Sequence, residues 1–328
     1  MNVAIVGATG LVGRQMIKSI VERGLKAENY YLFATERSEG TRFEIFGKEY
    51  AVHALTPSAV LNKRIDLALF SAGRSVARSF APLFVGRGAY VVDNSSAFRM
   101  DPKVPLVVPE VNPEDLFCDS RIIANPNCST IQATVAIKPI EDYKRIKRMV
   151  ISTYQAVSGA GQSGVKDLEN GLKCGTPQKF PRQIYSNCVP QVDDFGANGY
   201  TFEEDKMMNE SRKILKRPDL MITATCVRVP VFNCHSESLA IEFFEPFDLQ
   251  AVRNILRGAK GVRYFDDYPT AVDADGKDDV CVGRLRRDFS VDNGLNLWCV
   301  ADNVRKGAAV NAIEIAELLL KAGKISVN

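Results

Sequence analysis

The chain has 328 residues, of which 46% are hydrophobic and 25% charged, and its formal net charge is +3. Because a single core stops growing at about 250–300 residues, this length predicts two domains. The small net charge does not indicate a nucleic-acid partner. No apolar run approaches the roughly 20 residues that a membrane-spanning helix needs.

The eight cysteines are expected to be reduced thiols. The opening MNVAIVGATG begins a strand at once, without a charged leader or a cleavage site, so we expect a cytoplasmic protein. The spacing of Cys226, Cys234 and His235 does not match paired zinc ligands, and no metal site is expected.

The first half alternates short apolar strands with helices. Strands are predicted at 2–8, 30–35, 66–73, 89–96, 106–112 and 121–127. Helices are predicted at 10–24, with Gly24 as the stop, and at 75–88. Buried strands that alternate with helices indicate an α/β domain over 1–127, with a Rossmann-type, doubly wound parallel sheet.

The second half, 128–303, changes character. β-rich runs occur at 148–158, 223–231, 238–246 and 297–303. They are separated by a polar, loop-rich and partly helical region, which predicts an α+β domain with a mostly antiparallel sheet. The C-terminal segment 304–328 contains an amphipathic helix that ends at Gly323, and we expect it to pack back onto the first domain.

Two further segments have weaker patterns. The basic run at 284–287 is interpreted as a solvated face. Residues 170–191 are interpreted as an interaction subdomain beside the active site, with Cys174 and Cys188 as ordinary thiols.

Three glycines follow the first predicted strand. Gly7, Gly10 and Gly13 form G-x-x-G-x-x-G at the start of the first predicted helix. Glycines allow a tight turn and a close approach of backbone to a pyrophosphate, and the helix N-terminus supplies N–H groups. In the first βα turn this pattern predicts a dinucleotide site; the alternative is a turn that serves only helix–strand packing.

The end of the second strand bears on the choice of dinucleotide. An acidic residue there binds the ribose of NAD, whereas an arginine accepts the 2′-phosphate of NADP. Arg37 and Ser38 favour NADP, and the adjacent Glu36 leaves NAD open.

Cys128 lies where a predicted strand passes into a predicted helix. A cysteine inside an element usually packs as a small hydrophobic residue. At a helix N-terminus the dipole stabilises the thiolate, which lowers the pKa and makes the sulfur a nucleophile.

Only two histidines are present. His53 is interpreted as a surface or packing residue. A cysteine nucleophile needs a proton partner, so His235 is the candidate base, although spacing alone leaves a structural role equally open.

Three basic residues lie in contexts that suit anion binding: Arg99 after a strand end, Lys206 within EEDK, and Arg228 seven residues before His235. Each could also be a surface charge. A dinucleotide site, a thiol and anion binders together suggest acyl transfer coupled to hydride transfer.

Seven motifs occur in an order typical of a known family: GATGLVG, DNSSAFRMD, VVPEVN, NPNCSTIQ, STYQAVSGAG, EEDK and RVPVFNCHSE. The chain resembles aspartate-β-semialdehyde dehydrogenases over essentially its whole length. N-acetyl-glutamyl-phosphate reductases have a similar first domain, but their cysteine motif reads more like H-P-G-C-Y-P.

The resemblance implies roles for these positions. Cys128 would carry the acyl group as a thioester, His235 would be the general acid/base, and Gln155 would orient the intermediate. Arg228 and Glu203 would hold the substrate's carboxylate and amino group. Phosphate would bind to Arg99 and Lys206, and Asn127 would line the site. The residues implied to contact NADP are Gly7, Thr9, Gly10, Leu11, Val12, Arg37, Ser38, Ser158, Gly159 and Asn303.

The implied reaction reduces L-aspartyl-4-phosphate to L-aspartate-4-semialdehyde with NADPH and releases inorganic phosphate. It would serve lysine, methionine, threonine and diaminopimelate biosynthesis. The second domain would be catalytic and dimerising, in a homodimer or a tetramer of dimers. Two alternatives are an N-acetyl-glutamyl-phosphate reductase-like enzyme and a non-catalytic NADP-binding relative. Glu203 and Arg228 argue against the first. The second is disfavoured by the presence of Cys128, Gln155, Arg228 and His235.

Overall fold

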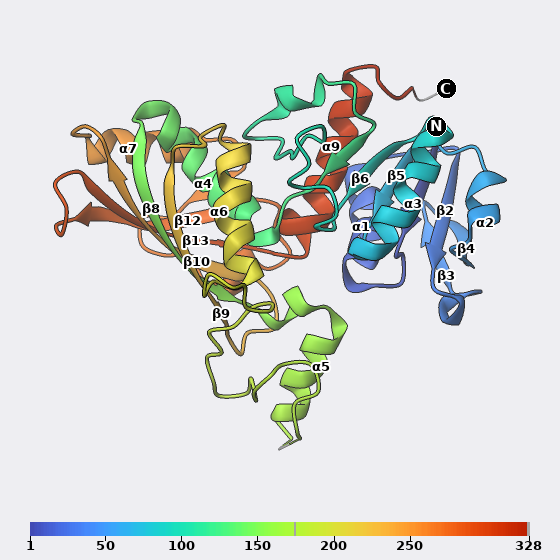
Figure 1. The fold of residues 1–328 in the computed structure, drawn as a ribbon, viewed down its shortest axis with the longest axis horizontal. Coiled ribbons are helices and arrows are strands. Elements are labelled where there is room, and N and C mark those ends of the chain that lie inside the picture. Colours follow the sequence, from blue (N-terminus) through green and yellow to red (C-terminus); the bar gives the residue numbers. More distant parts are fainter. Residues whose placement is uncertain (174, 327–328) are drawn as a thin grey trace. The chain divides into compact units, whose positions relative to one another are not determined.

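The computed structural model describes residues 1–173 and 175–326, so the predicted thiol Cys174 lies outside the described residues. The chain divides into two compact units (Figure 1). Unit 1 comprises Met1–Pro126 and the C-terminal segment from Ala308, and unit 2 comprises Asn127–Gly307. Among the described residues, no helix has both the length and the apolarity needed to cross a membrane.

A seven-stranded sheet forms the centre of unit 1, in the order β3-β4-β2-β1-β5-β6-β7. All neighbours pair in parallel except β3 and β4. The strands are β1 (Asn2–Val6), β2 (Asn29–Ala34), β3 (Arg42–Ile45), β4 (Lys48–Ala54), β5 (Leu67–Phe70), β6 (Tyr90–Asp93) and β7 (Ile122–Ala124). The predicted doubly wound parallel sheet is confirmed.

Helices cover both faces of this sheet. They are α1 (Leu11–Arg23), α2 (Pro57–Leu61), α3 (Arg74–Gly86) and α9 (Val310–Lys321), with short 3₁₀ turns η1 (Glu36–Ser38) and η2 (Pro113–Leu116). Val3 and Ile5 of β1 join a core with α1 and α9, whereas Ala4 and Val6 join a core with α2 and α3. Because both faces are buried, the strands are apolar throughout rather than alternating.

The C-terminal helix, α9, was predicted to be amphipathic, but more of its surface is buried than one apolar face would account for. It ends as predicted, with Gly323 following it at a φ of 66°. Even Asn311 is fully buried, and its Nδ2 donates to Val107 O (3.0 Å) and to Asn125 Oδ1 (2.6 Å). The helix is therefore a core element of unit 1.

One predicted strand is wrong. Residues 106–112 join the sheet only through a bridge between Leu106 and Ala124. The chain then turns back on itself, and Asn112 Nδ2 donates to Leu106 O (2.8 Å). Pro109 has no N–H, so the segment could not continue a β-ladder.

A six-stranded sheet forms the centre of unit 2, in the order β11-β12-β13-β10-β8-β9. Its strands are β8 (Ile146–Gln155), β9 (Met221–Arg228), β10 (His235–Phe243), β11 (Val262–Tyr264), β12 (Val280–Asp288) and β13 (Gly294–Ala301). The pairs β8–β10, β10–β13 and β12–β13 are antiparallel, and the two outer pairs are parallel. This confirms the predicted, mostly antiparallel sheet, although β11 and β12 were not predicted.

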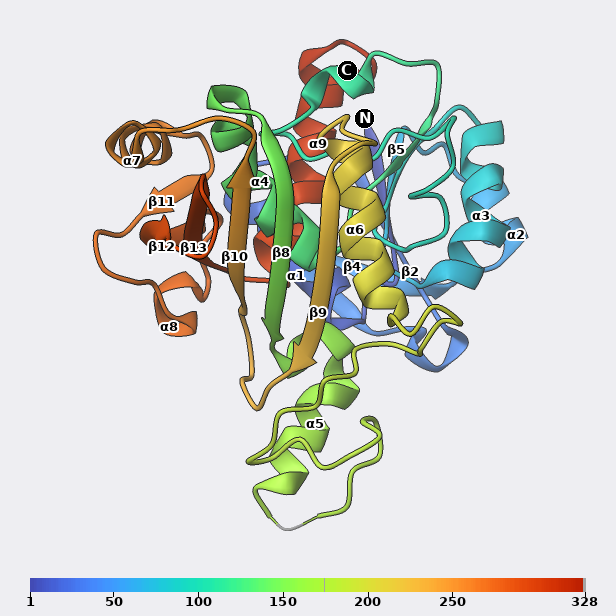
Figure 2. The ribbon, with the colours of Figure 1, turned by 60° about the vertical axis from the view of Figure 1, so that its left-hand side comes forward.

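The helices of unit 2 lie mainly on one face of its sheet. They are α4 (Cys128–Tyr143), α5 (Gln162–Gly171), α6 (Phe202–Ile214), α7 (Leu249–Gly258) and α8 (Ala271–Ala274), with turns η3 (Val157–Ala160) and the π-helical η4 (Arg305–Ala309). Figure 2 shows α4 and α6 behind β10, β8 and β9, whose other face is turned to the viewer. Burial alternates along β10, with the odd-numbered residues from His235 to Phe243 buried beneath the helices.

The segment after α5 extends away from the sheet (Figure 2). The Asp167 carboxylate accepts the N–H groups of Gln178, Lys179 and Phe180 at 2.6–3.1 Å. Burial alone would raise the pKa of Asp167, but these N–H donors lower it overall. This loop is therefore anchored by one carboxylate. In β12 the side chains of Arg284, Arg286 and Arg287 are exposed, as predicted for the basic run.

Candidate active site

Cys128 is the first residue of α4, as the sequence predicted. Its side chain is half-buried. Asn127 caps the helix, and its Oδ1 accepts the N–H groups of Ser129 (3.0 Å) and Thr130 (3.3 Å). The cap leaves the Cys128 sulfur beside the positive end of a 16-residue helix, where the dipole favours a thiolate.

Asn127 also joins the nucleophile to α6. Its Nδ2 donates to Glu203 Oε1 (2.8 Å), and its backbone N–H donates to Glu210 Oε2 (2.7 Å). The two glutamates are seven residues apart, so they lie on the same face of α6. All three side chains are buried. The orientation of the residue before Cys128 is thus set by two carboxylates.

Glu203 is the centre of a buried polar cluster. Gln155, at the end of β8, donates from Nε2 to Glu203 Oε1 (3.0 Å). Lys206 Nζ donates to Glu203 Oε2 (3.1 Å) and to Asp193 Oδ2 (2.7 Å). Burial would raise the pKa of Glu203, but Lys206 and the amides of Gln155 and Asn127 outweigh it and lower the pKa overall. Glu203 is therefore a carboxylate at neutral pH.

Arg228 ends β9, beside this cluster. Its Nη1 donates to Ala156 O (2.7 Å), and the guanidinium lies 5.8 Å from the centroid of the Phe180 ring. Burial lowers the pKa of Arg228, and the charges of Glu203 and Cys128 act in the opposite direction. An arginine keeps its proton in proteins, so this is a buried cation next to the thiol.

His235 is the first residue of β10, and its side chain is fully buried. Its Nδ1 accepts the backbone N–H of Ala156 (3.0 Å). Burial, followed by the charge of Arg228, holds the pKa of His235 well below its usual range. A Cβ built on Gly159 would lie 3.0 Å from His235 Nε2 and 2.9 Å from Arg228 Nη1. Only glycine at 159 leaves room over these two nitrogens.

The residues of unit 2 that were predicted to contact NADP form a second group. Ser158 Oγ donates to Asn303 Oδ1 (3.2 Å), and Asn303 Oδ1 also accepts the Cys234 N–H (3.0 Å). The bonds connect η3 to the chain after β13. They hold the turn that carries Gly159.

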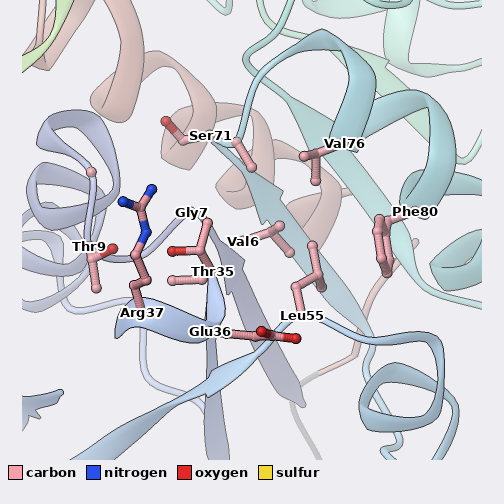
Figure 3. A pocket seen from close by; sticks show the side chains of 13 residues that line it. Val6, Gly7, Thr9, Thr35, Glu36, Arg37, Leu55, Ser71, Val76 and Phe80 are labelled. Atoms are coloured by element: carbon pink, nitrogen blue, oxygen red, sulfur yellow. The ribbon is translucent and has the colours of Figure 1, made fainter. Parts of the chain in front are cut away.

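The predicted dinucleotide loop surrounds a pocket of about 530 Å³ in unit 1 (Figure 3). Gly7 has a φ of 88°, and a Cβ there would lie 2.3 Å from Ser71 O. A Cβ on Gly13 would lie 2.1 Å from Gly7 O. Gly13 thus serves close helix–strand packing, whereas Gly7 gives the turn its left-handed conformation. Gly7, Thr9, Gly10 and Arg37 line the pocket.

Glu36 and Arg37 point in different directions in this pocket. The Arg37 guanidinium lies beside Thr9, whereas the Glu36 side chain extends toward Leu55 (Figure 3). Thr9 Oγ1 donates to Ser38 Oγ (3.2 Å). The cation and the hydroxyls therefore gather at the glycine loop, away from the Glu36 carboxylate.

Of the other residues predicted to bind cofactor, Leu11 and Val12 begin α1 and are not part of the pocket lining. Arg99, a predicted phosphate ligand, is buried in unit 1, where its Nη2 donates to Asn94 O (2.8 Å).

Several residues near the nucleophile were not predicted. Glu210 bonds the N–H of Asn127, and Gly307 in η4 is so close to Cys128 that a Cβ there would lie 2.9 Å from the Cys128 Cβ. The sequence did contain a signal for Glu210, because Glu203 and Glu210 are two glutamates at helical spacing. Nothing local marks Gly307, because its neighbour is far away in sequence.

One cluster in unit 2 has the composition of a metal site. Ligand atoms of Cys234, Asp275 and Asp302 lie within 4.8 Å of one another. The Asp302 carboxylate already accepts the N–H groups of Gly276, Val304 and Arg305 and an amide hydrogen of Asn233. Burial also raises the pKa of the Cys234 thiol. Because these donors already occupy the Asp302 carboxylate, we interpret the cluster as an anchor for the surrounding loops rather than as a metal site.

The sequence matches two family models, described as "Semialdehyde dehydrogenase, NAD binding domain" over residues 2–117 and "Semialdehyde dehydrogenase, dimerisation domain" over 137–306. The aspartate-semialdehyde dehydrogenase of Aquifex aeolicus is 51% identical over 338 aligned positions, which cover 99% of each chain. The chain belongs to the aspartate-semialdehyde dehydrogenase family. This confirms the predicted family, its oxidoreductase class and the dinucleotide-binding character of the first half.

Solved structures of aspartate-semialdehyde dehydrogenases have the same fold. Enzyme II from Vibrio cholerae, complexed with ASA, is 47% identical with a TM-score of 0.93, and the match covers 98% of both chains. The Candida albicans enzyme with NADP is 25% identical with a TM-score of 0.77, covering 99% of both chains. The fold is therefore shared beyond close relatives.

Proposed function

We propose that this chain reduces L-aspartyl-4-phosphate to L-aspartate-4-semialdehyde with NADPH, through a thioester on Cys128. The observation that supports this most directly is the arrangement around the sulfur. A capped helix N-terminus holds Cys128, and the buried cluster of Gln155, Glu203, Arg228 and His235 is assembled in the same unit.

The charges of the cluster suit an amino acid. Arg228 would hold the substrate's carboxylate, and Glu203, which remains ionised, would hold its ammonium group. Charge-assisted hydrogen bonds of this kind are about twice as strong as neutral ones. Acetylation of the amino group would remove the cation that Glu203 needs, which argues against an N-acetylglutamyl substrate. Gln155 would orient the acyl group.

Lys206 and Arg99 would bind the phosphoryl group. Lys206 now pairs with Asp193 and Glu203, so an arriving phosphate would compete with Asp193 for its ammonium. Neutralising the dianion stabilises the leaving group as the thiolate attacks. Asn127 would line the acyl site, and His235 would act as the general acid/base.

NADP would bind in the pocket of unit 1, with pyrophosphate at the glycine loop and the 2′-phosphate near Arg37. The Candida albicans relative was solved with NADP. Leu11 and Val12 would contribute backbone N–H groups of the first turn of α1. Ser158, Gly159 and Asn303 of unit 2 would contact the nicotinamide half. When bound, the cofactor supplies the hydride that reduces the thioester.

A homodimer would form through the outer face of the unit 2 sheet. Ser152, Ser238 and Trp298 lie in one row across β8, β10 and β13, and the Tyr154 ring is 5.4 Å from that of Trp298. Aromatic side chains such as Tyr154 and Trp298 are enriched in the cores of protein interfaces, which suits burial against a second copy. The described cysteines form no disulfide, which fits a cytoplasmic location.

The experiment that tests this function is reduction of NADP by the purified protein with L-aspartate-4-semialdehyde, with and without inorganic phosphate. We expect activity that requires phosphate, is weaker with NAD, and disappears in Cys128→Ala. Activity only with N-acetylglutamate semialdehyde would assign the chain to the sibling reductases. Tight NADP binding without either activity would favour a non-catalytic role.

A further inference from the structure

Lys206 forms two ion pairs that differ in how easily a ligand can replace them. Its Nζ lies 3.1 Å from Glu203 Oε2 and 2.7 Å from Asp193 Oδ2. Glu203 is buried and also accepts two amide hydrogen bonds, so separating it from Lys206 would leave a buried charge uncompensated. The Asp193 side chain is 40% exposed, and water can solvate its carboxylate once Lys206 is withdrawn. Asp193 is therefore the partner that a ligand can displace.

The segment that carries Asp193 is attached at both ends to elements of the site. Before it, Val189 exchanges two backbone hydrogen bonds with Arg228 at the end of β9 (2.9 and 2.8 Å). After it, Asp194 O accepts the N–H of Phe202, the first residue of α6 (2.9 Å). A displaced Asp193 carboxylate would therefore stay within reach of the ammonium. Such a tethered competitor has an effective concentration on the order of millimolar.

The backbone of Asp193 has a left-handed conformation. Its φ is 71°, which glycine, asparagine and aspartate adopt more readily than other residues. Its Oδ1 accepts the N–H of Asp194 (3.0 Å), and its Oδ2 accepts the hydrogen bond from Lys206 (2.7 Å). One oxygen therefore belongs to the turn and the other to the ion pair.

The cluster is electrically balanced without a ligand. Burial would lower the pKa of Lys206, but Glu203 and Asp193 outweigh it and raise the pKa overall. Lys206 is therefore an ammonium at neutral pH. The two acids, Glu203 and Asp193, balance the two cations, Lys206 and Arg228. A phosphate dianion would have to take the ammonium from Asp193 and would also be repelled by its charge.

We propose that Asp193 sets the affinity of this site for phosphate, because it occupies Lys206 when the site is empty and takes Lys206 back as phosphate leaves. The inference rests on the proposed function, which assigns phosphate to Lys206. In the reducing direction phosphate is a product, so a carboxylate that recaptures the ammonium favours its release. One ion pair replaces another, and no bond is formed or broken. Asp193 acts only through Lys206 and is a positioning residue.

The test is calorimetric titration of the whole protein with inorganic phosphate, for the wild type and for Asp193→Asn. Asparagine tolerates the same φ and keeps an oxygen for the Asp194 N–H, so chiefly the charge is lost. We expect phosphate to bind about three- to tenfold more tightly, because an exposed ion pair contributes up to about fivefold and the lost repulsion adds to it. The KM for phosphate should fall by the same factor, with an unchanged KM for NADP.

Asp194→Asn is the matched control. It removes the same charge one residue away, and neither ion pair of Lys206 involves Asp194. We expect a change of less than about twofold, since an exposed charge without a partner is screened. Equal tightening in both variants would reduce the effect of Asp193 to general charge and overturn the proposal.

Two further outcomes separate this inference from the proposed function. Unchanged or weaker phosphate binding in Asp193→Asn, with phosphate-dependent activity intact, would overturn this inference alone. Lys206→Met should abolish the binding. If Lys206→Met bound phosphate as tightly as the wild type, both this inference and the phosphate site of the proposed function would be wrong.

Discussion

The two units carry their functional groups in different ways. In unit 1 the glycine loop comes from one contiguous stretch, and its shape depends on residues a few positions apart. In unit 2 the groups around Cys128 come from the ends of β8 and β9, the start of β10, and α6. A contiguous motif can be recognised as such in a sequence. A cluster built from distant segments exists only once the chain has folded.

The largest expected effect comes from the nucleophile of unit 2. Cys128→Ala should lower kcat by at least about 10⁴-fold, since loss of a nucleophile costs up to about 10⁶-fold in other enzymes. NADP affinity, measured by fluorescence titration, should stay the same because the cofactor pocket lies in unit 1. Loss of NADP binding would mean that the two sites are not separable in this way.

A glycine substitution tests the local geometry of unit 1. Gly13→Ala places a Cβ 2.1 Å from the carbonyl oxygen of Gly7. Overpacking of this kind costs about 1–3 kcal/mol, so thermal stability and NADP affinity should both fall.

Gly86→Ala is the matched control for Gly13→Ala. Its Cβ would enter open space at the end of α3, and we expect a gain of about 0.5–1 kcal/mol in the free energy of unfolding. Equal effects of the two substitutions would contradict the assignment of Gly13 to close packing.

Glu210 tests how far the unit 2 cluster depends on support from α6. Glu210→Leu removes the acceptor for the Asn127 N–H. An unsatisfied buried donor costs about 1–3 kcal/mol, and a misplaced Cys128 should lower kcat about tenfold. Glu210→Gln keeps an acceptor oxygen and should recover most of kcat with an unchanged KM for NADP. A glutamine variant as slow as the leucine variant would point to the charge instead.

The smallest expected effect concerns pH and a buried acid. Burial raises the pKa of Glu237, and its Oε1 has no hydrogen-bond partner among the described residues. The folded state therefore prefers the protonated acid, so its stabilising effect is present below the unfolded pKa and is lost as pH rises toward the folded pKa.

Glu237→Gln should therefore raise the melting temperature at pH 8 and have little effect at pH 4.5. A gain of about 1 kcal/mol or more is expected at pH 8, because one pKa unit is worth about 1.4 kcal/mol. The exposed Glu44→Gln is the control and should show no such trend. A constant difference at all pH values would indicate that Glu237 is ionised in the fold.

The errors in the predicted elements have physical causes. The strand at 106–112 was inferred from apolar composition, but Pro109 removes a donor and Asn112 closes a turn. Strand β12 was missed because its basic residues face solvent, and the bulge at Arg284, with a φ of 53°, interrupts the alternation. In both segments the backbone hydrogen bonds, rather than hydrophobicity, decide the structure.

The sequence by itself determined the features that depend on neighbours along the chain. They include the glycine loop, the position of Cys128 after its Asn127 cap, and the alternation of strands and helices in the first half. Their causes are the permitted φ of glycine, the helix dipole and hydrophobic periodicity, which act over a few residues.

Only the tertiary structure decided which groups surround the nucleophile and in what state. Glu210 meets the N–H of Asn127 across 83 positions, and His235 meets the N–H of Ala156 across 79. These contacts remove polar groups from water, and burial then raises the pKa of Glu237 and lowers that of His235. For Glu203, burial is outweighed by Lys206 and by the amides of Gln155 and Asn127, so its pKa is lowered. No local pattern specifies these shifts. The chemistry of the site depends on that burial, which arises only when distant segments pack together.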